Sequence, residues 1–273
     1  MSASRSAARR WRDALASWAI PKEILDAAPE SPWTFPVELF ARRADAASGA
    51  RTVSNRLAAQ SLPEGGSVLD VGCGAGAASL PLIPPAGELV GVDTSAEMLR
   101  AFEARAAGAG AAVRTIEGKW PDVAGRTPTT DVVVCHHVLY NASELTAFAL
   151  ALTDHARRRV VVELTDTHPQ STLNDLWLRF HGLRRPTRPT ADDAEDVLHE
   201  AGLDPRREDW LAAPSGGFAE RRNLVAWVRR RLCLTPDRDP EIDAALGDRI
   251  IERDGLFGFE RQPLVTLWWP GTR

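Results

Sequence analysis

The spacing of apolar residues changes near residue 63. Before that point it is helical: Trp11, Leu15 and Trp18 stand at i, i+4 and i+7, the stripe by which a helix docks on a domain. The same spacing predicts further helices over residues 21–28, 37–47 and 51–61. The sequence Pro-Glu-Gly-Gly at 63–66 ends this pattern. The sequence therefore predicts a helical N-terminal extension over residues 1–62, which we expect to act as a lid.

After residue 66, short apolar runs alternate with helical stretches. The predicted strands are residues 67–71, 88–93, 112–116, 131–135 and 160–164. The predicted helices between them are residues 75–82, 95–107 and 142–156, and Thr94 and Glu97 predict a capping box at the start of the second. Nearly continuous apolar strands are typical of parallel strands covered on both faces. The alternation predicts an α/β fold with a doubly wound, mostly parallel, seven-stranded sheet.

The rhythm is interrupted after the fifth strand. Helical patterns are predicted over residues 171–183, 190–201, 218–233 and 240–251, with strands at 206–211 and 264–269. Residues 63–273 are thus predicted to form one domain, with helical insertions at about 169–190 and 217–252.

Composition limits the classes of partner and compartment. Hydrophobic residues make up 44% and charged residues 26% of the chain, as in ordinary soluble domains, and a net charge of −4 does not favour nucleic acid or an anionic membrane as partner. No apolar run reaches the roughly 18 residues of a membrane-spanning helix. Cys73, Cys135 and Cys233 form no CxxC pair, which argues against a disulfide framework or a zinc site and favours the cytoplasm. We expect no metal.

Three alternating glycines follow the first strand of the predicted sheet. The strand ends in Asp70, and Gly72, Gly74 and Gly76 come directly after it. Glycine tolerates positive φ and lets a ligand lie against the backbone. Asp93 ends the next strand, where a carboxylate accepts the hydrogen bonds of a ribose diol. This arrangement predicts a nucleotide-like cofactor, but it is shared by NAD enzymes and does not choose the cofactor by itself.

Two longer runs carry a resemblance to a known family. LDVGCGAG at 69–76 and GVDTSAEML at 91–99 closely resemble the first two motifs of class I S-adenosylmethionine-dependent methyltransferases. Residues 116–121 and 131–139 resemble the regions of that family at strands three and four, and the run at 264–269 suits its reversed seventh strand. The resemblance covers about residues 60–165. It implies that the cofactor is S-adenosyl-L-methionine.

The resemblance also implies site residues. It assigns cofactor contacts to Asp70, Gly72, Cys73, Gly74, Asp93, Thr94, Met98, Glu117, Lys119, Trp120 and Cys135. Among these, Asp70 and the glycines would hold the methionine part, Asp93 the ribose, and Trp120 would form a wall of the adenine pocket.

Candidate catalytic groups follow the fourth strand. Methyl transfer is an in-line displacement that needs no nucleophile on the enzyme, and a base matters only when the acceptor must lose a proton. His136 and His137 stand at the strand end, so alternation should point one of them toward the ligand. Tyr140 is expected to border the acceptor. Glu163 and His168 follow the fifth strand and are expected near the same edge.

We therefore expect a methyltransferase with a small-molecule acceptor and no membrane partner. The acceptor pocket is predicted from Trp33, Phe35, Trp177 and Phe180. One alternative is a tRNA or rRNA methyltransferase that uses the arginine-rich helix at 218–233, although Arg222, Arg229 and Arg230 fit a solvated helix face. Others are a methyltransferase-like binding protein without catalysis and a nicotinamide dehydrogenase. The acceptor atom and the oligomeric state stay open.

Overall fold

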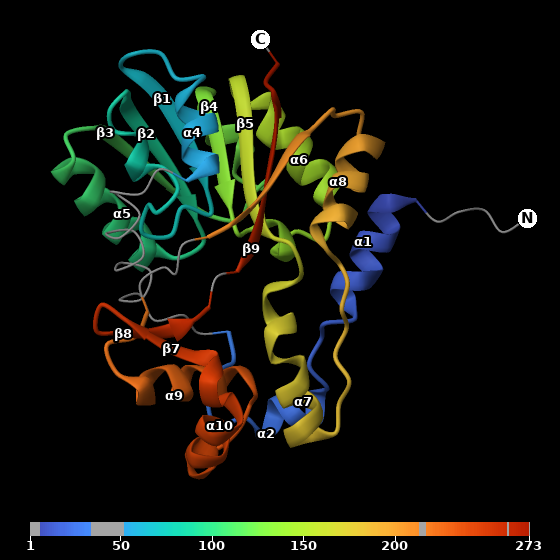
Figure 1. Cartoon of the computed structure of the whole chain (residues 1–273). Coiled ribbons are helices and arrows are strands. Elements are labelled where there is room, and N and C mark those ends of the chain that lie inside the picture. Colours follow the sequence, from blue (N-terminus) through green and yellow to red (C-terminus); the bar gives the residue numbers. More distant parts are fainter. Residues whose placement is uncertain (1–5, 34–51, 213–216, 261, 273) are drawn as a thin grey trace, which may run out of the picture.

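The computed structural model describes residues 6–33, 52–212, 217–260 and 262–272. Within these residues, a seven-stranded sheet has the order β3-β2-β1-β4-β5-β9-β6, in which β9 runs antiparallel to both of its neighbours (Figure 1). Its strands are β1 (Gly66–Val71), β2 (Ala86–Asp93), β3 (Ala112–Glu117), β4 (Thr130–His136), β5 (Ala156–Thr165), β6 (Arg206–Leu211) and β9 (Pro263–Pro270). Every predicted strand is present, and the predicted fold class is confirmed.

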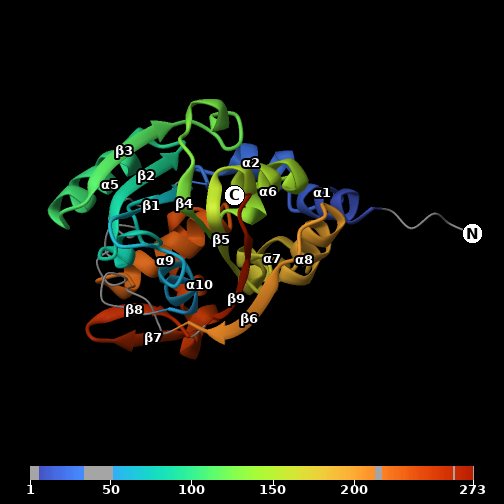
Figure 2. The same cartoon turned by 90° about the horizontal axis from the view of Figure 1, so that it is seen from above.

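Helices cover both faces of this sheet. On one face α1 (Ala7–Ala16), α6 (Leu145–Asp154) and α8 (Ala191–Glu200) share a core with inward side chains of the strands (Figure 2). On the other face α4 (Val53–Ala59) and α5 (Ala96–Gly108) pack with the segment that follows β1. Trp11 of α1 is fully buried, and its indole N–H donates to the carbonyl of Ala142 at 2.8 Å. The predicted apolar stripe of the first helix thus docks it on the sheet domain.

The helix predicted at 75–82 is wrong. Turns occupy this segment, and only Leu80–Leu82 form a single 3-10 turn. Pro81, Pro84 and Pro85 lack the N–H groups that an α-helix would need to continue, and Gly76 has a φ of +99°. Helix α4 lies against the 3-10 turn, where the Asn55 side-chain amide donates to the carbonyl of Ala78 at 3.1 Å. A helix from the N-terminal extension therefore packs beside the segment in which the missing helix was expected.

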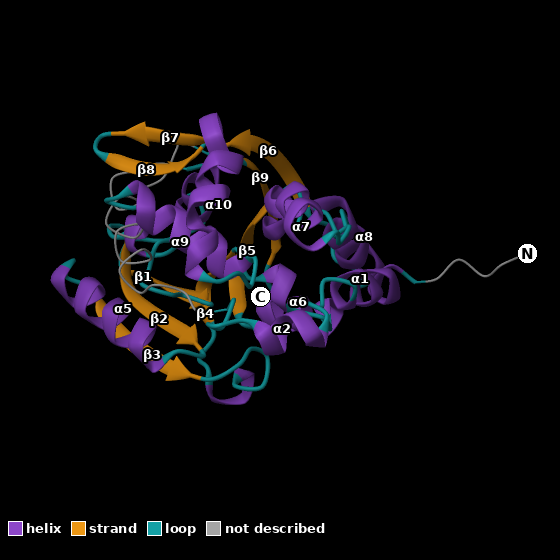
Figure 3. Cartoon of the chain, turned by 90° about the horizontal axis from the view of Figure 1, so that it is seen from below, coloured by secondary structure: helices purple, strands orange, loops and turns teal. Residues whose placement is uncertain are grey.

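A second body, which we call the cap, has a core of its own. It consists of α2 (Lys22–Ala27), α7 (Asn174–His181), α9 (Arg221–Arg231), α10 (Asp239–Leu246), β7 (Ile250–Arg253) and β8 (Leu256–Phe259). Trp177 and Ile242 are buried at its centre. The carboxyl ends of the parallel strands point toward the cap, and Figure 3 views α9 and α10 from that side. The N-terminal extension is thereby divided, with α1 and α4 on the sheet domain and α2 in the cap.

Two predictions of local structure need correction. The helix predicted at 240–251 ends at Leu246, and Ile250 begins the β7–β8 hairpin. Asp254 and Gly255 form its turn with φ values of +52° and +74°, so the Asp-Gly pair was a hairpin signal. The cap of α5 is Ser95, whose side chain accepts the Met98 N–H, and not Thr94. The predicted helix at 37–47 lies outside the described residues, within which no helix is both long and apolar enough to span a bilayer.

Candidate active site

The glycine turn after β1 has a backbone that only glycine adopts without strain. Gly72 and Gly74 have φ values of +73° and +49°. A Cβ atom on Gly72 would stand 2.4 Å from Cγ2 of Val138, the residue that lies two positions beyond the end of β4. The turn after β1 and the loop after β4 are therefore in direct contact at the carboxyl edge of the sheet.

Asp93, at the end of β2, holds the glycine turn from the other side. Its Oδ2 accepts the backbone N–H of Gly74 at 2.9 Å, and its Oδ1 accepts that of Ser95 at 2.9 Å. The side chain is partly exposed, and each carboxylate oxygen has a further lone pair for a ligand. Asp93 is thus fixed in place, with capacity left to accept the hydrogen bonds of a diol.

Asp70, at the end of β1, is almost fully buried. Its Oδ2 accepts the Ser79 hydroxyl at 2.6 Å, whereas its Oδ1 has no hydrogen-bond partner among the described residues. Burial raises the pKa of Asp70 from 3.8 to about 7, against the opposing hydrogen bond from Ser79 and with a smaller repulsion from Asp93. A buried acid with an open oxygen is a group that a cationic ligand would stabilise.

The segment after β3 places its residues differently from the expectation. Glu117 and Lys119 are exposed, and the Gly118 N–H donates to the backbone carbonyl of Asp93 at 2.9 Å. Trp120 is buried in the core of the sheet domain, and its indole N–H points to the carbonyl of Phe148 at 3.3 Å. The expectation that Trp120 walls the adenine pocket is therefore corrected, because this ring packs under α6.

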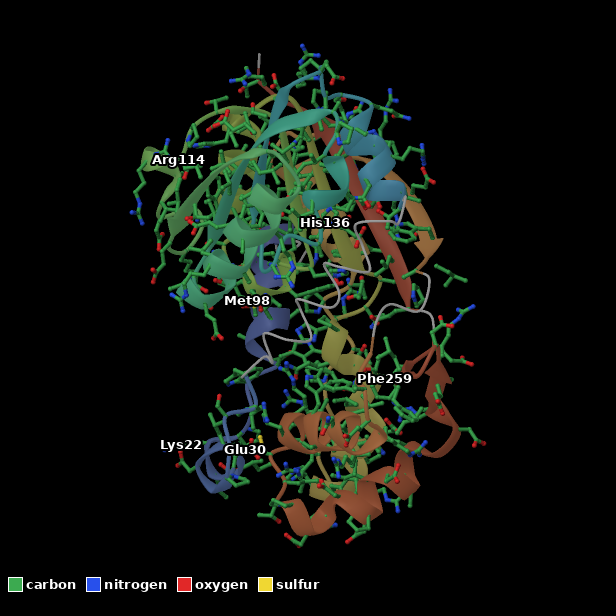
Figure 4. All side chains as sticks on the ribbon, turned by 90° about the vertical axis from the view of Figure 1, so that its left-hand side faces the viewer. Lys22, Glu30, Met98, Arg114, His136 and Phe259 are labelled. Atoms are coloured by element: carbon green, nitrogen blue, oxygen red, sulfur yellow. The ribbon has the colours of Figure 1, made fainter. Side chains whose placement is uncertain are left out.

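Three other assigned residues are also buried. Cys73 and Cys135 lie in the cores on opposite faces of the sheet, and all three cysteines of the chain are free. The side chain of Cys135 is wholly enclosed, so only its backbone remains for a ligand. Met98 is largely buried in the first turn of α5, and Figure 4 shows it toward the end of the sheet domain that faces the cap. The neighbouring Thr94 is exposed.

Tyr140 does not border an acceptor. Its hydroxyl donates to the carbonyl of Thr165 at 2.8 Å, and its ring stacks on Trp11 with centroids 5.6 Å apart. Burial raises the pKa of the Tyr140 phenol, with the neighbouring Asp166 acting in the same direction. Its placement among the catalytic candidates is corrected, since the side chain serves to dock α1.

The two histidines after β4 meet a buried carboxylate. Glu163 of β5 lies opposite His136 of β4 in the strand register and is 6% exposed. His137 Nε2 lies 3.2 Å from Glu163 Oε1, and His136 Nδ1 lies 3.9 Å from Oε2. His137 is half exposed and has a φ of +60°, while His136 is nearly buried. The loop after β4 thus presents one histidine outward and encloses the other.

The Glu163 carboxylate is held ionised by these neighbours. Burial opposes its ionisation, but the two histidines and the Ser54 hydroxyl outweigh burial and lower the pKa of Glu163 to about 2. Burial lowers the pKa of His136 below its usual range, although Glu163 acts in the opposite direction. At neutral pH the pair is therefore a carboxylate beside a neutral imidazole.

A chain of hydrogen bonds leads to Glu163 from β6, the strand at one edge of the sheet. The Trp210 N–H donates to Thr266 Oγ1 at 2.9 Å, Thr266 and Ser54 are joined through their hydroxyls at 2.8 Å, and Ser54 donates to Glu163 Oε2 at 2.6 Å. The sequence prediction missed Ser54, Thr266 and Trp210. A signal existed, because Thr266 interrupts an otherwise apolar run and Ser54 lies on the buried face of α4.

The loop after β5 has a structural role. His168 stacks on Trp18 with centroids 3.9 Å apart, and burial together with the Arg185 guanidinium lowers its pKa to about 4. Asp166 is partly exposed, with Oδ1 3.9 Å from Arg207. Within the described residues, no group of His, Cys, Asp or Glu side chains is arranged to hold a metal ion.

The arginines of α9 are mostly engaged with acids. Arg229 is 7% exposed and pairs with Glu30 at 3.2 Å and Asp239 at 3.0 Å, so its expected place on the solvated face was wrong. Arg230 also pairs with Glu30, at 3.0 Å. Figure 4 shows Glu30 on the outside of the cap, away from His136. These charges tie the cap together, and the paired arginines do not form an open basic surface.

The expected acceptor pocket is corrected in part. Trp177 is 1% exposed in the core of the cap, and Phe180 packs against that core. Trp33 is 48% exposed, and Phe35 lies outside the described residues. The buried Trp177 ring is thus not available to line an acceptor site.

Residues 68–158 match the family described as a methyltransferase domain. This range begins in β1 and includes the glycine turn, Asp93 and both histidines. Residues 68–158 thus form a methyltransferase domain, in agreement with the resemblance found in the sequence. A methyltransferase domain agrees with S-adenosyl-L-methionine, the cofactor that the sequence motifs predict. No curated protein matches this methyltransferase in sequence.

Solved structures share its fold at low sequence identity. The YcgJ protein of Bacillus subtilis is 17% identical with a TM-score of 0.52, over 81% of this chain and 98% of that one. A cyclopropane-fatty-acyl-phospholipid synthase-like protein of Lactobacillus casei is 16% identical with a TM-score of 0.53, over 90% and 97%. Magnesium protoporphyrin IX methyltransferase of Synechocystis, solved with bound SAH, is 15% identical with a TM-score of 0.51, over 98% and 100%.

Proposed function

We propose that this methyltransferase transfers the methyl group of S-adenosyl-L-methionine to a small-molecule acceptor, in the cytoplasm. The observation that carries the proposal is the position of the cap, whose separate core stands on the side of the sheet domain to which the parallel strands point. A cap over the reacting edge favours a small acceptor. The pairing of Arg229 and Arg230 with Glu30 removes the main argument for RNA. The free cysteines support the cytoplasmic location.

The residues after β1 and β2 fit the cofactor. Gly72 and Gly74 leave the left-handed turn without side chains at two positions, so that the methionine part can lie against it. The buried Asp70 offers its unpartnered Oδ1 to the positive charge of that part. Asp93 would accept the ribose hydroxyls, with Met98, Thr94 and the 117–119 segment near the base. When bound, the cofactor supplies an activated methyl group. The protein residues bind and orient it, and His136 or His137 takes a proton from an acceptor that must lose one.

A direct test uses S-adenosyl-L-methionine with a labelled methyl group and two acceptor pools, a small-molecule extract and total RNA. We expect S-adenosylhomocysteine (SAH), the demethylated cofactor, and labelled product with the small-molecule extract only. Labelling of RNA would favour the nucleic-acid alternative, and cofactor binding without SAH from either pool would favour a binding protein without catalysis.

A matched pair of variants tests the cofactor site by calorimetry. Asp93→Asn should weaken cofactor binding by at least tenfold, since an amide presents a donor in place of one carboxylate oxygen. Glu88→Gln serves as the control, because Glu88 is an exposed acid at the opposite end of the same strand. Equal affinity of the two variants would remove Asp93 from the site, and binding of NAD in place of S-adenosyl-L-methionine would overturn the cofactor assignment.

A further inference from the structure

His136 has a ring nitrogen for which the described residues provide no partner. Its side chain is 11% exposed, and its Nε2 is buried with no hydrogen-bond partner among them. A buried polar atom without a partner costs on the order of 1–3 kcal/mol, so such an atom at a ligand edge indicates a partner that arrives with the ligand. His137 differs, since its Nε2 already lies 3.2 Å from Glu163.

The environment of His136 decides what kind of partner fits. Its Nδ1 faces the Glu163 carboxylate at 3.9 Å, which favours the tautomer with the proton on Nδ1. The Nε2 is then an acceptor with one lone pair, and it requires a hydrogen-bond donor. An anionic acceptor such as a carboxylate does not fit, because it brings no proton and would be repelled by the ionised Glu163.

The remaining choice is between a hydroxyl and an ammonium group. Both oxygens of Glu163 already have partners, with His137 beside Oε1 and Ser54 donating to Oε2 at 2.6 Å. An ammonium group would therefore lose its water without gaining a free carboxylate, which is costly for a charge. A hydroxyl has a single proton to give, and it matches the single open acceptor.

We propose, on the basis of the function proposed above, that the acceptor is a hydroxyl compound whose O–H donates to His136 Nε2, and that the enzyme is an O-methyltransferase. The acceptor oxygen forms a bond to the methyl carbon as the carbon–sulfur bond breaks, and the electron pair of that bond remains on sulfur in SAH. The hydroxyl proton passes to His136 Nε2. The Glu163 carboxylate stabilises the resulting imidazolium.

The position of the loop supports this role. Val138, two residues beyond His136, is the residue that a Cβ on Gly72 would meet, so His136 lies one short segment away from the cofactor turn. Glu163 and Ser54 are positioning residues, because they act on the acceptor only through His136. The Thr266 hydroxyl, 2.8 Å from Ser54 and fully buried, holds the serine in this arrangement.

Nitrogen NMR of the histidine side chains tests the tautomer without any acceptor. At neutral pH His136 should show a protonated Nδ1 and an unprotonated Nε2, and Glu163→Gln should lower the pH at which it takes up a second proton. A protonated Nε2, or no change in the Glu163→Gln variant, would overturn the proposal. This spectrum decides the matter even if no acceptor is found.

The transferred atom is identified by carbon-13 NMR after reaction with carbon-13 methyl-labelled cofactor and a small-molecule extract. The methyl signal should be that of a methyl ether, and an N-methyl, S-methyl, C-methyl or methyl ester signal would overturn the proposal. His136→Gln should lower turnover by about 10²- to 10⁴-fold, the range for loss of a general base, and Glu163→Gln by about 10- to 100-fold. His199→Gln is the control, since His199 is half exposed near the end of α8. Absence of SAH with every acceptor would instead refute the proposed function.

Discussion

Replacement of Asp70 by asparagine should stabilise the protein in the absence of cofactor. The carboxyl group is buried, and its pKa is raised from 3.8 to about 7. The folded protein therefore holds a proton that the unfolded chain releases, so stability falls as pH rises from about 4 to about 7 and is constant above that. A shift of roughly 3 units at 1.36 kcal/mol each amounts to about 4 kcal/mol at pH above 7.

The same arithmetic gives the difference between two pH values. At about pH 5 only roughly 1.2 units of the shift are expressed, which is about 1.6 kcal/mol. The wild-type protein should therefore lose about 2.7 kcal/mol more by about pH 8. Asparagine cannot ionise, and its side-chain oxygen still accepts the Ser79 hydroxyl. The Asp70→Asn variant should therefore lack this part of the pH dependence and be more stable at high pH.

The assay is urea denaturation of the cofactor-free protein across this pH range, with the free energy of unfolding compared between variants. Glu88→Gln, at an exposed site on β2, should follow the wild-type profile. Parallel profiles for Asp70→Asn and wild type would refute the reasoning. Cofactor binding provides a second check. The wild-type protein should gain more stability from S-adenosyl-L-methionine than the variant does, because the positive charge of the cofactor interacts with the Asp70 carboxylate.

Three further predictions concern single contacts. Gly72→Ala should abolish cofactor binding in a calorimetric titration, because of its φ of +73° and the 2.4 Å contact with Val138, and adding Val138→Ala should restore binding only in part. Trp11→Ala should destabilise the protein by about 3–5 kcal/mol in urea denaturation, and a loss below 1 kcal/mol would show that α1 is not docked. Glu163→Gln should flatten the dependence of stability on pH in the acid range. The pKa of Glu163 is lowered to about 2, so its contribution to stability is complete above about pH 4.5 and is lost as pH falls toward 2. An unchanged loss of stability between these pH values would contradict the prediction.

Much of the fold followed from local sequence. The apolar runs of the strands, the Gly72–Gly76 turn and Asp93 at the end of β2 are each defined within a few residues, so periodicity and glycine placement were enough to predict them. The predictions that were wrong concern segments whose structure depends on contacts with residues far away in the sequence. The segment 75–82 looks helical by itself, but its prolines end it and α4 packs beside the turn. Trp120, Tyr140 and Trp177 follow strands whose ends form the candidate site, which is why the sequence suggested that they line it. In the structure each of the three side chains is buried in a hydrophobic core.

In the candidate site, too, the sequence determined some features and the tertiary structure determined the others. The sequence placed His136 and His137 at the end of β4, and strand alternation indicated that they point apart. Only the tertiary structure decided which ring is enclosed, because Glu163 arrives from β5 and Ser54 from α4. The separation of these residues along the chain leaves no periodic pattern to read. Burial and hydrogen bonding of a side chain depend on what the rest of the fold brings against it, and that is a property of packing that local sequence does not contain.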